Sequence, residues 1–122
     1  RLVSSSPSHD SPSAIEETDD ILVMTTQTAI ANLHPEAEDR TGKPVQSRFK
    51  KWIEAAGKAG LFVVLDEAHH APAHGCRNLL VGRDGARPGV RVIAPGANLL
   101  GLTATPTYTD ETRRGWLGRI FE

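Results

Sequence analysis

Cysteine, methionine and long apolar runs are scarce in this chain. The single cysteine, Cys76, excludes an internal disulfide and agrees with a reducing compartment, so we expect a cytoplasmic protein. No apolar run approaches the ~20 residues that a membrane span needs, and no signal-peptide pattern opens the chain. The formal net charge of −1 gives no global attraction to nucleic acid, so any such contact must come from local patches or from other parts of a longer protein.

The overall composition is that of an ordinary globular protein. With 122 residues, 39% of them hydrophobic and 24% charged, the chain is long enough for one domain at most. It begins at Arg1, its only methionine is Met24, and Phe121 and Glu122 end it inside an amphipathic pattern. We therefore expect an excerpt of a longer protein.

Strand and helix patterns alternate after a polar beginning. Residues 1–20 are rich in serine and acidic side chains, and they predict a linker or a surface loop. The short apolar run at residues 21–24 predicts a strand, and a short helix follows it. Residues 47–60 predict a helix that lies on a core by one side, because its apolar residues recur at helical spacing. Those residues are Phe49, Trp52, Ile53 and Ala56.

The second strand pattern, LFVVL at residues 61–65, is apolar without alternation. Such a run is expected where helices cover both faces of a parallel sheet. A short helix is predicted from residue 74, a further short strand at residues 90–95, and another strand at residues 99–102. After a capping-box pattern at Thr107 and Asp110, one apolar stripe predicts a last helix. The stripe consists of Trp116, Leu117, Ile120 and Phe121. The alternation predicts an α/β fold with right-handed crossovers.

Two adjacent carboxylates, Asp66 and Glu67, come directly after the apolar strand LFVVL. Ligands of open parallel sheets bind beyond the carboxyl ends of the strands, which is where this pair is expected. Two ionised carboxylates repel each other unless a cation or a proton offsets them, and Mg²⁺ prefers such oxygen ligands. One carboxylate would hold the hydrated metal while its neighbour orients an attacking water. This division suits hydrolysis of a phosphoanhydride.

Three segments resemble motifs of superfamily 2 helicases and translocases. VVLDEAHHAP resembles the DEAH form of motif II, the Walker B element. LGLTATP resembles motif III as it occurs in the motor subunits of type I and type III restriction enzymes, and ILVMTTQTAI is similar to motif Ib. The resemblance implies a partial RecA-like (P-loop NTPase) domain with a parallel sheet flanked by helices. Residues 21–122 would be the second half of the first such domain.

The resemblance also implies a role for individual residues. Asp66 would hold the Mg²⁺ of bound ATP through water, and Glu67 would be the base or the positioning group for the hydrolytic water. Thr25 would contact a phosphate of the bound nucleic acid, with DNA favoured over RNA by the likeness of LTATP to restriction-type motors. The residues that would link nucleotide state to domain movement are His69, Thr103, Ala104 and Thr105.

The chain departs from the family pattern in what it lacks. The P-loop, G-x-x-x-x-G-K-[ST], cradles phosphates with backbone amides and a lysine, and it is absent. RTGKPV supplies Gly42 and Lys43, but Ala37 replaces the first glycine and Pro44 replaces the hydroxyl residue. The second RecA-like domain is missing as well. We expect an ATP-driven motor in the parent protein and no ATP hydrolysis by these residues alone.

Two alternatives stay open. The first is a degenerate motor domain that serves as a nucleic-acid-binding scaffold. The second is a zinc-binding module, for which Pro72 argues against one continuous helix presenting the histidines. Its ligands would be drawn from Glu67, His69, His70, His74 and Cys76.

Each single feature also has a simpler explanation. The acidic pair alone would suit a solvated turn or the beginning of a helix. Thr25, Thr103 and Thr105 alone would suit turns, caps or strand ends.

Overall fold

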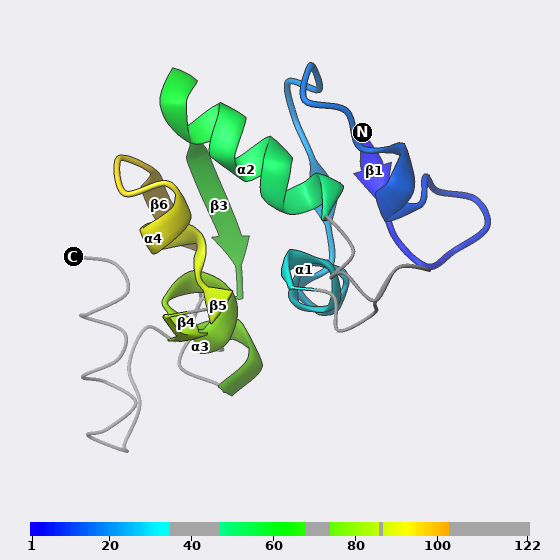
Figure 1. Ribbon diagram of the computed structural model, residues 1–122. Helices are drawn as coiled ribbons and strands as arrows, with labels where there is room; N and C mark the ends of the chain where they lie inside the picture. Colours follow the sequence, from blue (N-terminus) through cyan, green and yellow to red (C-terminus); the bar gives the residue numbers. More distant parts are fainter. Residues whose placement is uncertain (35–46, 68–73, 86, 103–122) are drawn as a thin grey trace, which may run out of the picture.

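The structure is a computed structural model that describes residues 1–34, 47–67, 74–85 and 87–102 (Figure 1). The elements in chain order are β1 (Leu2–Val3), the 3-10 helix η1 (Pro12–Ala14), β2 (Val23–Met24), α1 (Thr26–Leu33), α2 (Arg48–Ala59), β3 (Phe62–Asp66), α3 (His74–Leu80), β4 (Gly82–Asp84), β5 (Arg87–Pro88), α4 (Val90–Ile93) and β6 (Asn98–Leu102). Helices are interspersed with strands along the chain and two of the strand pairs are parallel, so the predicted α/β class is confirmed. None of the helices in these ranges is long and apolar enough to cross a membrane.

Two parallel strand pairs form the frame of the described fold. β1 pairs with β2, and β3 pairs with β6 in a register that runs from Phe62↔Asn98 to Asp66↔Leu102. Over the described residues these pairs are separate two-stranded sheets, and β4 and β5 form a third, antiparallel one. The parallel pairing of β3 with β6 brings the carboxyl ends of both strands to one edge.

Helix α2 organises the core above β3 (Figure 1). Ser47 caps its first turn by accepting a hydrogen bond from the backbone N–H of Lys50 at 3.1 Å, and the hydroxyl of Ser47 donates to the carbonyl of Asn32 near the end of α1. The helix ends at Gly60, whose φ of 111° favours glycine. Phe49 and Ile53 are buried on one side of α2, as the sequence predicts.

The face of β3 that packs on the helices is formed by Val63 and Leu65. Val63 packs against the main core, and Leu65 packs against Leu80 of α3. Phe62 and Val64 lie on the other face of the strand and are exposed. The expectation that both faces are covered is therefore wrong for the described residues, because α2, α3 and α4 all lie toward the same core.

Residues 1–20, expected to be a linker or surface loop, differ in part from that expectation. Most of them are exposed, but Leu2–Val3 pairs with β2, and Val3 and Ile15 are buried in the main core. Arg48 of α2 donates a hydrogen bond to the carbonyl of Ile15 at 3.3 Å. The segment is polar on average, but its two buried apolar side chains pack in the main core. The segment is therefore part of the folded domain.

The predicted strand at residues 90–95 is also corrected. The structure has the four-residue helix α4, Val90–Ile93, in its place. Gly89 precedes the helix, and its carbonyl accepts hydrogen bonds from the N–H groups of Val92 and Ile93 at 3.0 Å. A short run rich in β-branched residues fits the period of a strand as well as that of a helix. The packing of Val90 into the core decides in favour of the helix.

Candidate functional site

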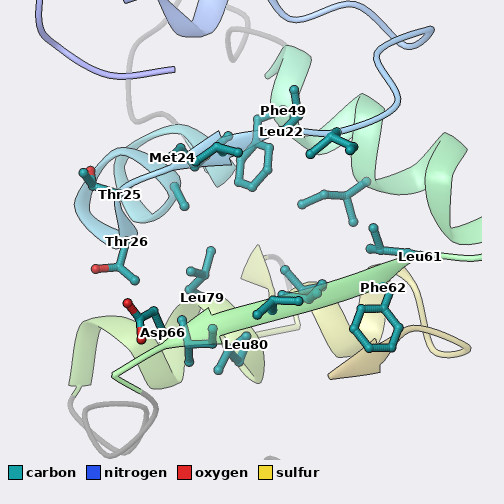
Figure 2. Close-up of a pocket in the computed structure, with 18 of the residues that line it drawn as sticks. Leu22, Met24, Thr25, Thr26, Phe49, Leu61, Phe62, Asp66, Leu79 and Leu80 are labelled. Atoms are coloured by element: carbon teal, nitrogen blue, oxygen red, sulfur yellow. The ribbon is translucent and has the colours of Figure 1, made fainter. Parts of the chain in front are cut away.

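A pocket of about 710 Å³ lies between β2 with α1 on one side and β3 on the other (Figure 2). Apolar side chains from β2, α2, β3 and α3 line most of it. The polar residues that line it are Thr25, Thr26, Asp66 and Glu67. Three of these four are predicted site residues, so the fold brings Thr25, Asp66 and Glu67 to one pocket. Figure 2 shows Thr26 and Asp66 at the same end of it.

Asp66 is the last residue of β3, and the chain turns immediately after it. The backbone N–H of Glu67 donates a hydrogen bond to Oδ1 of Asp66 at 2.9 Å. Glu67 has a φ of 54°, in the left-handed region that non-glycine residues seldom occupy. This turn ends the alternation of successive side chains between the two faces of β3. Both carboxylates are exposed at the carboxyl end of the strand.

The oxygen ligands at this end suit a hydrated Mg²⁺ better than a metal cage made by protein alone. Within the described ranges, no group of three or more His, Cys, Asp or Glu side chains is placed to hold a metal ion. Mg²⁺ usually keeps several waters and takes one or two carboxylates together with substrate phosphates. The carboxylate of Asp66 accepts one hydrogen bond at Oδ1 and has further lone pairs on both oxygens. Asp66 therefore fits the part of a single protein ligand.

Thr25 has a structural contact of its own. It is the N-cap of α1, where its Oγ1 accepts a hydrogen bond from the backbone N–H of Thr28 at 3.2 Å and donates one to Oγ1 of Thr28 at 2.9 Å. The beginning of α1 thus faces the pocket next to Asp66. A contact between Thr25 and a nucleic-acid phosphate stays a prediction.

Thr26 lines the pocket and was missed by the sequence reasoning. Its side chain acts on the thiol of Cys76 in α3, whose pKa it lowers against the larger, opposite effect of burial. The signal that marks it is its position directly after the predicted strand and the predicted cap, since the first residues of a helix after a strand face the ligand edge of a parallel sheet.

The zinc hypothesis gains nothing from Cys76. Burial raises the pKa of the Cys76 thiol, with the side chain of Thr26 acting in the opposite direction. Zinc binds the thiolate, so a raised pKa disfavours the ligating form. His69, His70 and the side chain of His74 lie outside the described part of the chain.

The predicted coupling residues are also outside the described ranges. Thr103, Ala104 and Thr105 come after Leu102, the last described residue, and His69 lies two positions beyond Glu67. Their roles stay predictions. The register Asp66↔Leu102 nevertheless shows that β3 and β6, in which the two motif segments begin, end side by side.

Comparison with known proteins identifies a family. Residues 4–108 match the model of a family described as type III restriction enzyme, res subunit. The matched span is more than half of the chain, begins within the N-terminal segment and includes both carboxylates. No curated protein and no solved structure matches the chain.

Proposed function

Since the chain belongs to the family of type III restriction enzyme res subunits, we propose that it is part of an ATP-dependent motor that translocates on or unwinds nucleic acid, with DNA the favoured track. The family is one of helicase-like ATPases with a RecA-like fold, and the mixed α/β structure with parallel strand pairs agrees with a partial domain of that kind. The P-loop segment and the second RecA-like domain would come from other parts of the same parent chain.

The observation that carries the proposal is the meeting of two strand ends. Asp66 and Leu102 are paired in register, and each lies within a segment that resembles a motif of superfamily 2 helicases and translocases. In parallel sheets this edge is where ligands bind, because loops leave the strands there and helices begin there. The polar end of the pocket, formed by Thr25, Thr26 and the two carboxylates, lies at the same edge.

The two carboxylates would divide the chemistry between them. Asp66 would hold the hydrated Mg²⁺ of ATP, which supplies neutralisation of phosphate charge when bound. Glu67 would accept a hydrogen bond from the attacking water and orient it toward the γ-phosphate. Asp66 ends the strand and Glu67 adopts a left-handed backbone conformation, so the two neighbouring carboxylates start from different backbone conformations, which supports separate roles.

We expect Glu67→Gln in the full parent protein to lower ATP hydrolysis by about 10²–10⁴-fold, the usual contribution of general acid–base catalysis, while nucleotide binding survives. Hydrolysis is measured as phosphate release with and without single-stranded DNA, double-stranded DNA and RNA. Binding is measured with a fluorescent ATP analogue. Glu54→Gln, on the exposed side of α2, is the matched control and should leave hydrolysis unchanged.

Two outcomes decide against parts of the proposal. If the wild-type parent hydrolyses no ATP on any polymer, a retired motor domain that acts as a nucleic-acid-binding scaffold describes it better. Turnover by the isolated 122 residues would contradict our inference that the missing P-loop segment is required.

A further inference from the structure

Positive charge gathers in the segment that runs from α3 to α4. Residues 77–91 contain four arginines and one acidic residue, Asp84, which gives the segment a formal net charge of +3, whereas the whole chain has −1. A chain without an overall positive charge contacts nucleic acid through a local patch. By its sequence, this segment is such a patch.

The fold brings the four arginines together from four neighbouring elements. Arg77 belongs to α3, Arg83 to β4, Arg87 to β5 and Arg91 to α4. Helix α3 packs beside β4, α4 packs beside β5, and the two helices also contact each other; Figure 1 shows α3, β4 and β5 next to one another. Arg83 is exposed and the other three are partly exposed. We call these four residues the arginine surface.

The two strands of the arginine surface are held closely at their base. A Cβ on Gly82 would lie 2.7 Å from the backbone nitrogen of Gly89, and one on Gly89 would lie 2.5 Å from the backbone nitrogen of Gly82. Gly82 also has a φ of 111°, which favours glycine. Because the backbones approach so closely, the strands that carry Arg83 and Arg87 have little freedom to lose when a partner binds.

Helix α1 connects the arginine surface to the predicted phosphate contact at Thr25. The ring Nε2 of His34, the C-cap of α1, donates a hydrogen bond to the carbonyl of Pro88 in β5 at 2.6 Å. Thr25 caps the other end of the same helix, whose eight residues span about 12 Å at 1.5 Å per residue. One strand of a duplex carries a phosphate about every 3.4 Å along the axis. A backbone that passes Thr25 therefore reaches the far end of α1 within about four phosphates.

The residue type suits a phosphate partner. The planar guanidinium can donate two parallel hydrogen bonds to phosphate oxygens, which a lysine ammonium cannot do. Each of the four arginines already has an interaction within the chain. A guanidinium has five N–H donors, so an internal contact need not use all of them. Such a contact also restrains the side chain before a phosphate arrives.

We propose that the arginine surface binds the phosphodiester backbone of the nucleic-acid track, with DNA favoured. The identity of the partner rests on the proposed function, but the contact needs no nucleotide and no hydrolysis. Contacts to phosphates fix the position of a protein on the duplex and carry no sequence information. Together with Thr25, the arginine surface holds the track at both ends of α1.

Duplex binding by the full parent protein without nucleotide tests the proposal. A labelled DNA duplex is titrated by fluorescence anisotropy at several salt concentrations. We expect Arg83→Gln combined with Arg87→Gln to weaken binding about tenfold or more. The same variant lowers the slope of log affinity against log salt by about two, because each lost phosphate contact contributes about 0.9. The matched control, Lys51→Gln with Lys58→Gln, removes two charges from the exposed side of α2 and leaves the affinity within about twofold.

A single substitution separates binding from folding. Arg83 is exposed, so Arg83→Gln should leave thermal unfolding unchanged and still lower the salt slope by about one. If the parent hydrolyses no ATP but the arginine variants still lose duplex binding, the arginine surface stands and the motor activity fails.

Three results would overturn the assignment. Equal losses in the arginine and lysine variants would mean that only net charge matters. Unchanged affinity and salt slope in the double arginine variant would place the track elsewhere. A wild-type parent that binds no duplex would remove the proposed partner.

Discussion

At the level of single residues, the site depends on an abrupt change of backbone conformation at the end of β3. Asp66 keeps strand geometry, and Glu67 adopts a φ of 54° one residue later. A non-glycine residue in the left-handed region costs of order 1–3 kcal/mol and persists only where the surroundings hold it, which is typical of functional sites. The hydrogen bond from the Glu67 N–H to Asp66 is one such restraint. Thr25 also has two roles to separate. Its hydroxyl caps α1, and it is the predicted contact to a nucleic-acid phosphate.

The cap function of Thr25 is testable apart from any nucleic acid. We expect Thr25→Ala to lower the free energy of unfolding by about 1 kcal/mol, because the N–H of Thr28 loses its partner. Thr25→Ser retains an equivalent oxygen and should stay close to the wild type. Urea unfolding followed by circular dichroism measures both. If the alanine variant is as stable as the serine variant, Thr25 does not cap α1 in solution.

At the level of elements, α2 shows why amphipathic helices are predicted well and short apolar runs poorly. Its apolar period, the Ser47 cap and the terminal Gly60 are all local signals, and the structure contains the helix at Arg48–Ala59. The run VRVI has no period long enough to distinguish strand from helix, and its contacts make it α4. The two helices meet where Gly57 faces Ala94.

That contact predicts an unusual response to a helix-favouring substitution. A Cβ at position 57 would lie 2.6 Å from Cβ of Ala94, closer than real Cβ contacts allow. We expect Gly57→Ala to destabilise the fold by about 1–3 kcal/mol through overpacking, which outweighs the gain of about 1 kcal/mol in helix propensity. The double variant with Ala94→Gly should recover most of the loss in thermal or urea unfolding. Additive effects of the two substitutions would show that the helices do not meet there.

At the level of the whole molecule, the N-terminal segment decides how much of the chain is domain. Leu2–Val3 extends from a polar stretch into a parallel pair with β2, and Ile15 reaches the core that α1, α2 and α4 share. The indole Nε1 of Trp52 donates to the carbonyl of Asp19 at 2.7 Å and ties the end of the segment to α2. The family match also begins within this segment, at residue 4.

Substitutions at two isoleucines test whether residues 1–20 belong to the folded domain or form a linker. Ile15 is 2% exposed and Ile21 is 68% exposed. We expect Ile15→Ala to lower the free energy of unfolding by about 2–5 kcal/mol, as for other buried large-to-small changes, while Ile21→Ala changes it by less than about 0.5 kcal/mol. Chemical unfolding of both variants provides the comparison. If both substitutions change the free energy of unfolding equally and only slightly, residues 1–20 are a linker and not part of the domain.

Patterns of neighbouring residues in the sequence were sufficient to predict the α/β class, the helix over residues 47–60, the strand that ends in Asp66 and the family. Apolar period, capping residues and motif spacing are properties of neighbouring residues, and they need no knowledge of distant contacts. The membership of Thr25, Asp66 and Glu67 in one pocket, the burial of Val3 and Ile15, and the choice of helix for VRVI depend on which elements pack together. So does the exposure of Phe62 and Val64 on β3. Burial is a property of the assembled core, because the free energy of removing a side chain from water depends on partners that are distant in sequence.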